Sequence, residues 1–265
     1  MWETSSIGGI LADRAPDGAR RPRPNDRSLS GRCRRTLPRP DDPGALDREI
    51  SVQTIVIANP KGGSGKTTLA TNVAGWLAGK RQRVVLADAD PQRSASQWLR
   101  RRPPLFPAIV GQDGDTKKKD LKEFDPQWVV VDTAAGANGE SLRDAVRRAD
   151  VMLVPLSAST FDMAATQRFL GTLADYKAVK DGNLALGIVA MRVDARTIAA
   201  AELDEFLKGF EFPLVAHLRD TQLYVYCARD GLSVFDLPRS RAEQDWEQWR
   251  PLTRWVGRQV AARNS

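Results

Sequence analysis

Cysteine, histidine and long apolar runs are scarce in this sequence of 265 residues. It contains two cysteines and one histidine. Cys33 and Cys227 lie far apart and match no metal-binding or redox spacing, so we expect incidental thiols in a reducing compartment. The histidine, His217, has no partner nearby in the sequence and is predicted to be an ordinary surface or loop residue. With no bilayer-spanning run and no signal-peptide core, we expect a cytoplasmic protein.

Lysine is absent from the first fifty residues, which differ in composition from all that follows. Residues 20–24 and 32–40 combine arginine with proline and show no hydrophobic periodicity. Such a segment buries too little apolar surface to offset the entropy that ordering costs. We therefore predict a disordered Arg/Pro-rich extension over residues 1–50 and a folded domain over residues 51–265. The extension is either an arm for nucleic acid or the result of a start assigned too far upstream, with Val52 opening the real protein.

The remaining composition fits one α/β domain with a substantial core. Hydrophobic residues make up 42% of the sequence, and its formal net charge is +7. A basic balance of this kind fits a polyanionic partner.

Apolar runs alternate with helical patterns from Val52 onward. The runs lie at residues 55–58, 84–87, 128–131, 151–155 and 186–190, with a weaker one at 214–216. Helical patterns lie between them, for example at residues 141–148 and 200–209. Strands that are apolar on both faces and separated by helices indicate a mainly parallel sheet between two helix layers. We predict a three-layer α/β/α fold with a twisted sheet whose ligand binds at the carboxyl ends of the strands.

A glycine-rich loop at residues 61–68, with the sequence KGGSGKTT, follows the first apolar run and precedes a helical pattern. In this setting glycines let backbone N–H groups point at phosphates beside a helix N-terminus. Lys66 is predicted to reach the β- and γ-phosphates, and Thr67 to bind Mg²⁺. The candidate nucleotide-binding residues are Gly62, Gly63, Ser64, Gly65, Lys66, Thr67 and Thr68.

This loop departs from a regular Walker A motif, because Pro60 stands where the first glycine belongs and Lys61 adds a second lysine. At these residues the chain resembles the deviant-Walker P-loop ATPases of the ParA/MinD class. The resemblance implies a P-loop NTPase fold, with ATP and Mg²⁺ as ligands. It also implies that Lys61 crosses the interface of a homodimer to touch the ATP of the partner subunit, and it assigns both Lys61 and Lys66 to catalysis.

Asp88 and Asp90 follow the second apolar run, in the sequence ADADPQ. The two carboxylates are spaced i, i+2 at the end of a strand, and the loop begun by Pro91 lets them take different roles. The resemblance places Asp88 near the Mg²⁺ shell and gives Asp90 the orientation of the water that attacks the γ-phosphate. The alternative is a pair of loop carboxylates that cap the next helix.

Asp132 ends the apolar run at residues 128–131, which is a Walker B pattern and predicts a ligand of the Mg²⁺ hydration shell. The ParA/MinD class usually continues Asp-Thr-Pro-Pro, whereas this chain continues Thr133-Ala134-Ala135. Met191 likewise stands where many relatives place an asparagine that reads adenine. Selectivity for ATP over GTP is therefore implied by the family alone.

The length and the opening of the glycine loop look most like the small ParF-type partition ATPases. This resemblance implies an ATP-bound homodimer, non-specific DNA binding with association to the nucleoid, and a centromere-binding adaptor of the ParB or ParG kind. A solvated basic face is the alternative for the arginines that we name as DNA contacts. These candidate DNA contacts are Arg192, Arg219, Arg239 and Arg241.

The C-terminal stretch at residues 246–256 mixes aromatic and basic residues, as a membrane-targeting helix of a MinD-like positioning ATPase would. Leu252, Val256 and Val260 have helical spacing and fit a helix packed on the core more simply. Pro251 is predicted to interrupt or restart that helix. Membrane binding is therefore not expected, and a positioning ATPase acting on a membrane or protein cargo remains the alternative to DNA partition.

Overall fold

Neighbouring strands in the structure are all parallel. The computed structural model describes residues 52–114, 121, 123–136, 139–157, 160–194 and 196–263. Within them one seven-stranded sheet has the order β3-β2-β4-β1-β5-β6-β7. The strands are β1 (Gln53–Ile57), β2 (Val84–Asp88), β3 (Val110–Asp113), β4 (Trp128–Asp132), β5 (Val151–Leu156), β6 (Ala185–Met191) and β7 (Leu214–Leu218). The extension predicted for residues 1–50 lies outside the described residues.

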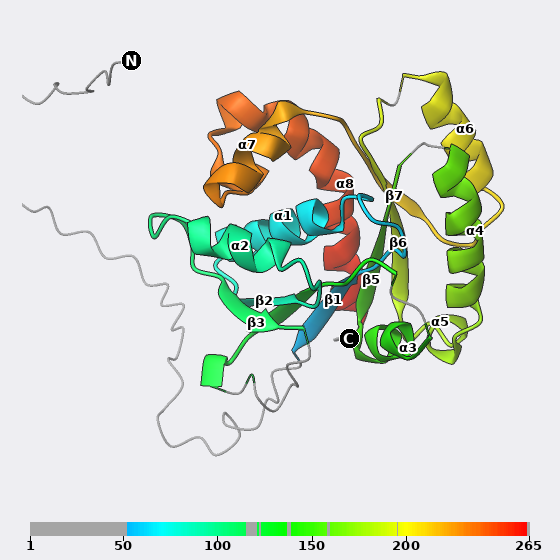
Figure 1. The fold of residues 1–265 in the computed structure, drawn as a ribbon, viewed down its shortest axis with the longest axis horizontal. Coiled ribbons are helices and arrows are strands. Elements are labelled where there is room, and N and C mark those ends of the chain that lie inside the picture. The colour runs from blue at the N-terminus through cyan, green and yellow to red at the C-terminus, as the bar shows by residue number, and fades with distance from the viewer. Residues whose placement is uncertain are drawn as a thin grey trace, which may run out of the picture. The chain divides into compact units, whose positions relative to one another are not determined.

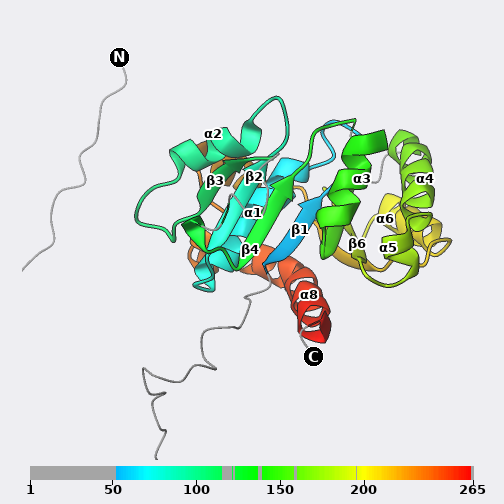
Figure 2. The same ribbon diagram turned by 90° about the horizontal axis from the view of Figure 1, so that it is seen from below.

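Two helix layers cover the sheet, one on each face (Figure 1). Figure 2 shows the same division from below. One layer holds α1 (Lys66–Gly79), α2 (Ser94–Arg101), α7 (Gln222–Asp230) and α8 (Arg239–Arg263), together with the 3₁₀ turn η2 (Val234–Asp236). The other holds α3 (Gly139–Arg148), α4 (Thr160–Ala174), α5 (Lys177–Lys180) and α6 (Ile198–Leu207). The predicted three-layer α/β/α architecture is confirmed.

Burial on both faces explains why the central strands could be recognised from their composition. All residues of β1 and β5 are buried. The edge strand β3 alternates between half-buried and exposed residues, in the sequence VGQD. Its pairing with β2 supplies its stability, and it carries no apolar run that a sequence reading could detect.

Helix α8 packs its apolar face on the core, as the spacing of Leu252 and Val256 predicted. The expected interruption at Pro251 is wrong, because α8 continues through it and its backbone irregularity lies at Ala242 (φ −123°, ψ 19°). Pro251 lies on the exposed side of the helix, where water can bond to the Glu247 carbonyl that the proline leaves without a donor. No helix among the described residues is long and apolar enough to cross a membrane.

Candidate nucleotide-binding site

The glycine-rich loop joins the carboxyl end of β1 to the first residue of α1. Gly63 (φ 72°) and Gly65 (φ 94°) adopt left-handed backbone conformations, which side chains other than hydrogen rarely tolerate. A Cβ at Gly65 would also lie 3.0 Å from the Met191 methyl group at the end of β6. Glycine at these two positions therefore gives the loop its curvature, and Gly65 also leaves room for Met191 at the end of β6.

Lys66 is the first residue of α1 and lies beneath the loop. Its Nζ donates a hydrogen bond to the Lys61 carbonyl at 3.0 Å. Burial lowers the pKa of Lys66, while the nearby charges of Asp132 and Asp90 act in the opposite direction. Gly136, after β4, donates its N–H to the Pro60 carbonyl at 2.7 Å, which ties the Walker B loop to the glycine loop. The ammonium group thus lies between the loop and two carboxylates, where triphosphate oxygens would be matched by charge.

Thr67 and Asp132, predicted from separate motifs, meet directly. The Thr67 hydroxyl donates to Asp132 Oδ2 at 2.7 Å. Asp132 has 0% exposure, and its Oδ1 is a buried atom with no hydrogen-bond partner. Burial above all, with the charges of Asp88 and Asp90, raises the Asp132 pKa to about 7, while the Thr67 bond opposes the rise.

This arrangement fits Mg²⁺. A buried carboxylate oxygen without a partner and a neighbouring threonine hydroxyl are the protein groups that usually hold Mg²⁺ with its waters and the phosphates. Thr67 and Asp132 would hold the ion, which when bound neutralises phosphate charge. Among the described residues no three His, Cys, Asp or Glu side chains cluster as a metal site, and a phosphate-bound Mg²⁺ needs no such cluster.

Replacing Asp132 by asparagine is expected to stabilise the nucleotide-free protein at pH 8. The raised pKa means that, between about pH 4 and pH 7, the folded state still holds a proton on Asp132 that the unfolded state has already lost. Wild-type stability therefore falls as pH rises through that window and levels off above it. The gain of Asp132→Asn should grow over the same window, to at most about 4 kcal/mol. Thermal melts from pH 4 to 8 measure it, and a constant difference would contradict it.

Asp88 and Asp90 make different contacts in the structure. Asp88 is buried, and its carboxylate accepts the N–H of Asp90 at 3.2 Å and of Ser96, in the first turn of α2, at 2.7 Å. This is the helix-capping role that the alternative reading described. Asp90 accepts the Gln92 N–H at 2.9 Å and lines the cavity beside Lys66. The metal-shell role of Asp88 and the water-orienting role of Asp90 stay predictions.

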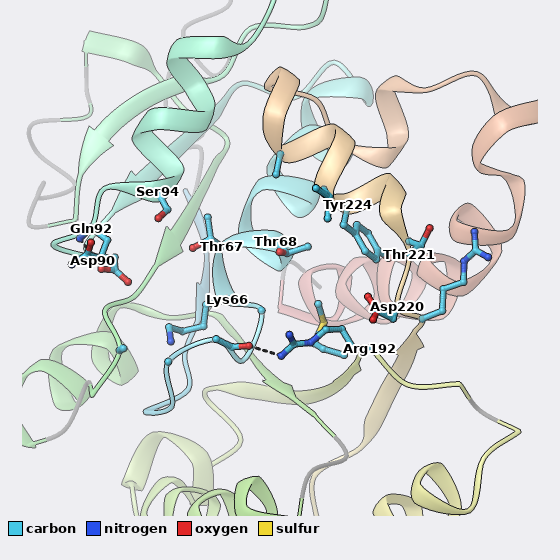
Figure 3. A pocket seen from close by; sticks show the side chains of 18 residues that line it. Lys66, Thr67, Thr68, Asp90, Gln92, Ser94, Arg192, Asp220, Thr221 and Tyr224 are labelled. Atoms are coloured by element: carbon cyan, nitrogen blue, oxygen red, sulfur yellow. Dashed lines mark hydrogen bonds between the residues drawn. The ribbon is translucent and has the colours of Figure 1, made fainter.

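A cavity of about 620 Å³ lies over the glycine loop. Figure 3 shows Lys66, Thr67 and Asp90 on one side of it, with Arg192 and Tyr224 on the other. Residues of the cavity wall that were not predicted from the sequence include Ser94, Asp220, Thr221, Tyr224, Val225 and Ala228. Most of them belong to α7 and the turn before it, where Thr221 accepts the Leu223 N–H as a helix cap. This helix-cap pattern was the one feature of the sequence that could have drawn attention to these residues, and a helix cap does not indicate a ligand.

Two of the four candidate DNA contacts lie at this cavity. Arg192 donates from Nη2 to the Gly63 carbonyl at 2.6 Å. Arg219 makes a two-bond ion pair with Asp245 of α8, at 3.0 and 2.9 Å, and the buried Asp245 raises the pKa of Arg219. Both guanidinium groups therefore have structural contacts at the site.

The other two candidates lie at the start of α8. Arg239 Nε lies 3.4 Å from Glu243 Oε1, and the Arg241 guanidinium lies 4.4 Å from the centre of the Tyr226 ring. DNA contact by any of the four arginines stays a prediction.

Among the described residues, the two rare side chains His217 and Cys227 lie outside the cavity lining. His217 Nε2 lies 2.8 Å from Asp204 Oδ1, which links β7 to α6. Cys227 is buried in α7, and burial raises its thiol pKa to about 12. Neither residue is placed to serve as a base or nucleophile at the glycine loop.

Comparison with known proteins agrees with this geometry. The family described as the CobQ/CobB/MinD/ParA nucleotide binding domain matches residues 55–226. The maintenance of carboxysome distribution protein A of Gloeobacter kilaueensis is 30% identical over 210 residues, which cover 78% of this chain and 94% of that protein. The chromosome-partitioning ATPase Soj of Thermus thermophilus is 27% identical over 191 residues, covering 60% and 76%.

Solved structures show the same fold. A putative plasmid partition protein of Borrelia burgdorferi, bound to AMPPNP, superposes with a TM-score of 0.58 at 16% identity. The match covers 77% of this chain and 99% of that one. At this identity the likeness concerns the arrangement of helices and strands.

Proposed function

The chain belongs to the CobQ/CobB/MinD/ParA family of P-loop nucleotide-binding ATPases, and we propose that it is a Mg²⁺-dependent partition ATPase. In this proposal ATP closes two copies into a homodimer with both nucleotides at the interface. The dimer binds DNA without sequence preference. A centromere-binding adaptor resets it by stimulating hydrolysis.

The observation that carries the proposal is the difference in burial between the two lysines of one loop. Lys66 is 6% exposed and bonds to the loop beneath the phosphate position, whereas Lys61 is an exposed residue on the same loop. A lysine on the outer side of a phosphate-binding loop is suited to a phosphate of another subunit. The site supports ATP capture in one chain and charge neutralisation from a second.

Slow turnover follows from what surrounds the proposed γ-phosphate position. Asp90 is the carboxylate that we assign to orienting the attacking water, and it already accepts a backbone N–H. Catalysis then rests on positioning and charge, through Lys66, the loop amides and the lysine supplied by the partner. ATP would persist long enough to act as a clamp until the adaptor accelerates hydrolysis.

Two kinds of cargo have support among the relatives. Soj of Thermus thermophilus is named for chromosome partitioning, which supports a DNA cargo. The relative from Gloeobacter kilaueensis is named for carboxysome distribution, which favours a protein assembly as the second candidate. Membrane targeting through α8 has less support, because Trp249, Leu252 and Val256 of that helix are buried in the core.

The protein should bind random-sequence DNA duplex only with ATP and Mg²⁺, and its affinity for that DNA should fall steeply as the salt concentration rises. Neutralised phosphates release counterions, so the logarithm of the binding constant should decline linearly with the logarithm of salt concentration. Fluorescence anisotropy at several salt concentrations measures the slope, and pelleting with anionic vesicles is the parallel assay. A flat slope would remove the DNA role, and ATP-dependent pelleting with vesicles would favour the membrane alternative.

A further inference from the structure

Two side chains outside the KGGSGKTT sequence brace the segment that carries Lys61. We propose that Asn59 and Arg192 are positioning residues, which hold residues 61–63 so that Lys61 projects toward the nucleotide of the partner subunit. This inference rests on the proposed role of Lys61 across the dimer interface. It assigns neither residue a contact with the reacting atoms.

Asn59 connects the backbone of Lys61 to the centre of the sheet. Its Oδ1 accepts the Lys61 N–H at 2.8 Å, and its Nδ2 donates to the Pro155 carbonyl in β5 at 2.7 Å. The side chain is 3% exposed. Because one end donates and the other accepts, neither a carboxylate nor an apolar residue reproduces both bonds. Lys61 is thereby tethered to a buried strand just where its side chain leaves the loop.

Arg192 holds the other end of the segment from a different strand. It follows β6 directly, and its Nη2 donates to the Gly63 carbonyl at 2.6 Å, drawn as a dashed line in Figure 3. Its backbone has φ 55°, a left-handed conformation that is costly for a residue with a Cβ. Strained conformations of this kind persist where surrounding contacts hold them, and they concentrate at functional sites. The exposed Arg192 side chain contributes no buried apolar surface that would explain the strain.

The brace matters most when nucleotide binds. Lys66 Nζ bonds to the Lys61 carbonyl, yet the same ammonium group is the one expected on the β- and γ-phosphates. When phosphate competes for it, the bond to Lys61 weakens. Asn59 at the Lys61 amide and Arg192 two residues further along then keep the segment in place. A pre-ordered backbone lowers the entropy that dimer closure must offset.

The matched control for Asn59 is Asn72, whose side chain also donates one hydrogen bond to a backbone carbonyl and accepts one from a backbone N–H, elsewhere in the core. Asn72 is 2% exposed, donates to the Thr68 carbonyl and accepts the Val234 N–H, both at 2.8 Å. Asn59→Ala and Asn72→Ala should lower the melting temperature alike. Only Asn59→Ala should weaken the dimer formed with AMPPNP and Mg²⁺, by about tenfold. Its affinity for a fluorescent ATP analogue, measured in dilute monomer, should stay within about threefold of wild type.

Arg192→Gly separates function from stability, with Arg196→Ala in the same loop as its control. Glycine accepts the left-handed backbone, so the melting temperature should be unchanged or higher. The dimer should nevertheless weaken by about tenfold, as judged by sedimentation. The inference would be overturned if Asn59→Ala and Arg192→Gly both dimerised like wild type. It would also be overturned if these two variants lost nucleotide affinity as monomers to the same extent as they lost dimerisation. A wild-type protein that stays monomeric with AMPPNP would instead overturn the proposed function, and the inference with it.

Discussion

Lys66→Ala is expected to weaken ATP binding by about 100-fold or more and to abolish measurable hydrolysis. The reason is that Lys66 is the one lysine in the described structure that is buried under the glycine loop, with Asp132 and Asp90 nearby. Its removal takes away the cation that we assign to the β- and γ-phosphates. It also leaves the Lys61 carbonyl without its donor. Titration with a fluorescent ATP analogue, followed by a phosphate-release assay, measures both effects.

Lys80→Ala is the matched control for this variant. Lys80 is exposed at the other end of α1, so its removal changes the net charge equally without touching the cavity. The control should bind and hydrolyse ATP as the wild type does. If Lys66→Ala bound ATP within a few-fold of wild type, the assignment of the phosphate position would be wrong.

Lys61→Ala is expected to lower hydrolysis by about 10³-fold while leaving the nucleotide affinity of the monomer within about threefold of wild type. Lys61 is exposed, and its contact with Lys66 of the same subunit is made by its backbone carbonyl, which accepts a hydrogen bond from the Lys66 ammonium group. Its ammonium group is assigned to the nucleotide of a second subunit, where a cation supplied in trans stabilises transition-state charge. The dimer with AMPPNP should be lost together with hydrolysis.

The contrast between the two lysine variants is the informative result. Lys66→Ala should fail at the first step, nucleotide binding, whereas Lys61→Ala should bind nucleotide and fail at the second, closure. Lys80→Ala again supplies the control for lost charge. A Lys61→Ala protein that hydrolyses ATP normally would show that this lysine is a solvated charge on a glycine loop.

The sequence predicted those parts of the site whose chemistry is local to one segment. The glycine loop carries its own backbone requirements, and the strand before Asp132 is apolar because it is buried. Six strands were visible as apolar runs for the same reason. The edge strand β3 was missed, since only its pairing with β2 makes it a strand. Pro251 misled for a related reason, because packing of the flanking residues on the core outweighs one missing hydrogen bond.

Apart from the meeting of Thr67 and Asp132, which two motifs indicated, contacts between distant segments could not be read from one sequence. Arg219 was assigned to DNA on charge alone, and nothing near it in the sequence points to Asp245 on α8. Arg192 was assigned in the same way, but its bond to Gly63 spans 129 positions. The wall of the cavity formed by α7 depends on how that helix docks against the sheet. Each of these features requires the fold before it can be seen.

Sedimentation velocity of the wild-type protein, with and without AMPPNP and Mg²⁺, tests the central claim most directly. We expect a monomer without nucleotide and a dimer with the analogue, because we assign the Lys61 ammonium group of each subunit to the phosphates held by the other. A protein that sediments only as a monomer at saturating analogue and Mg²⁺ would contradict it.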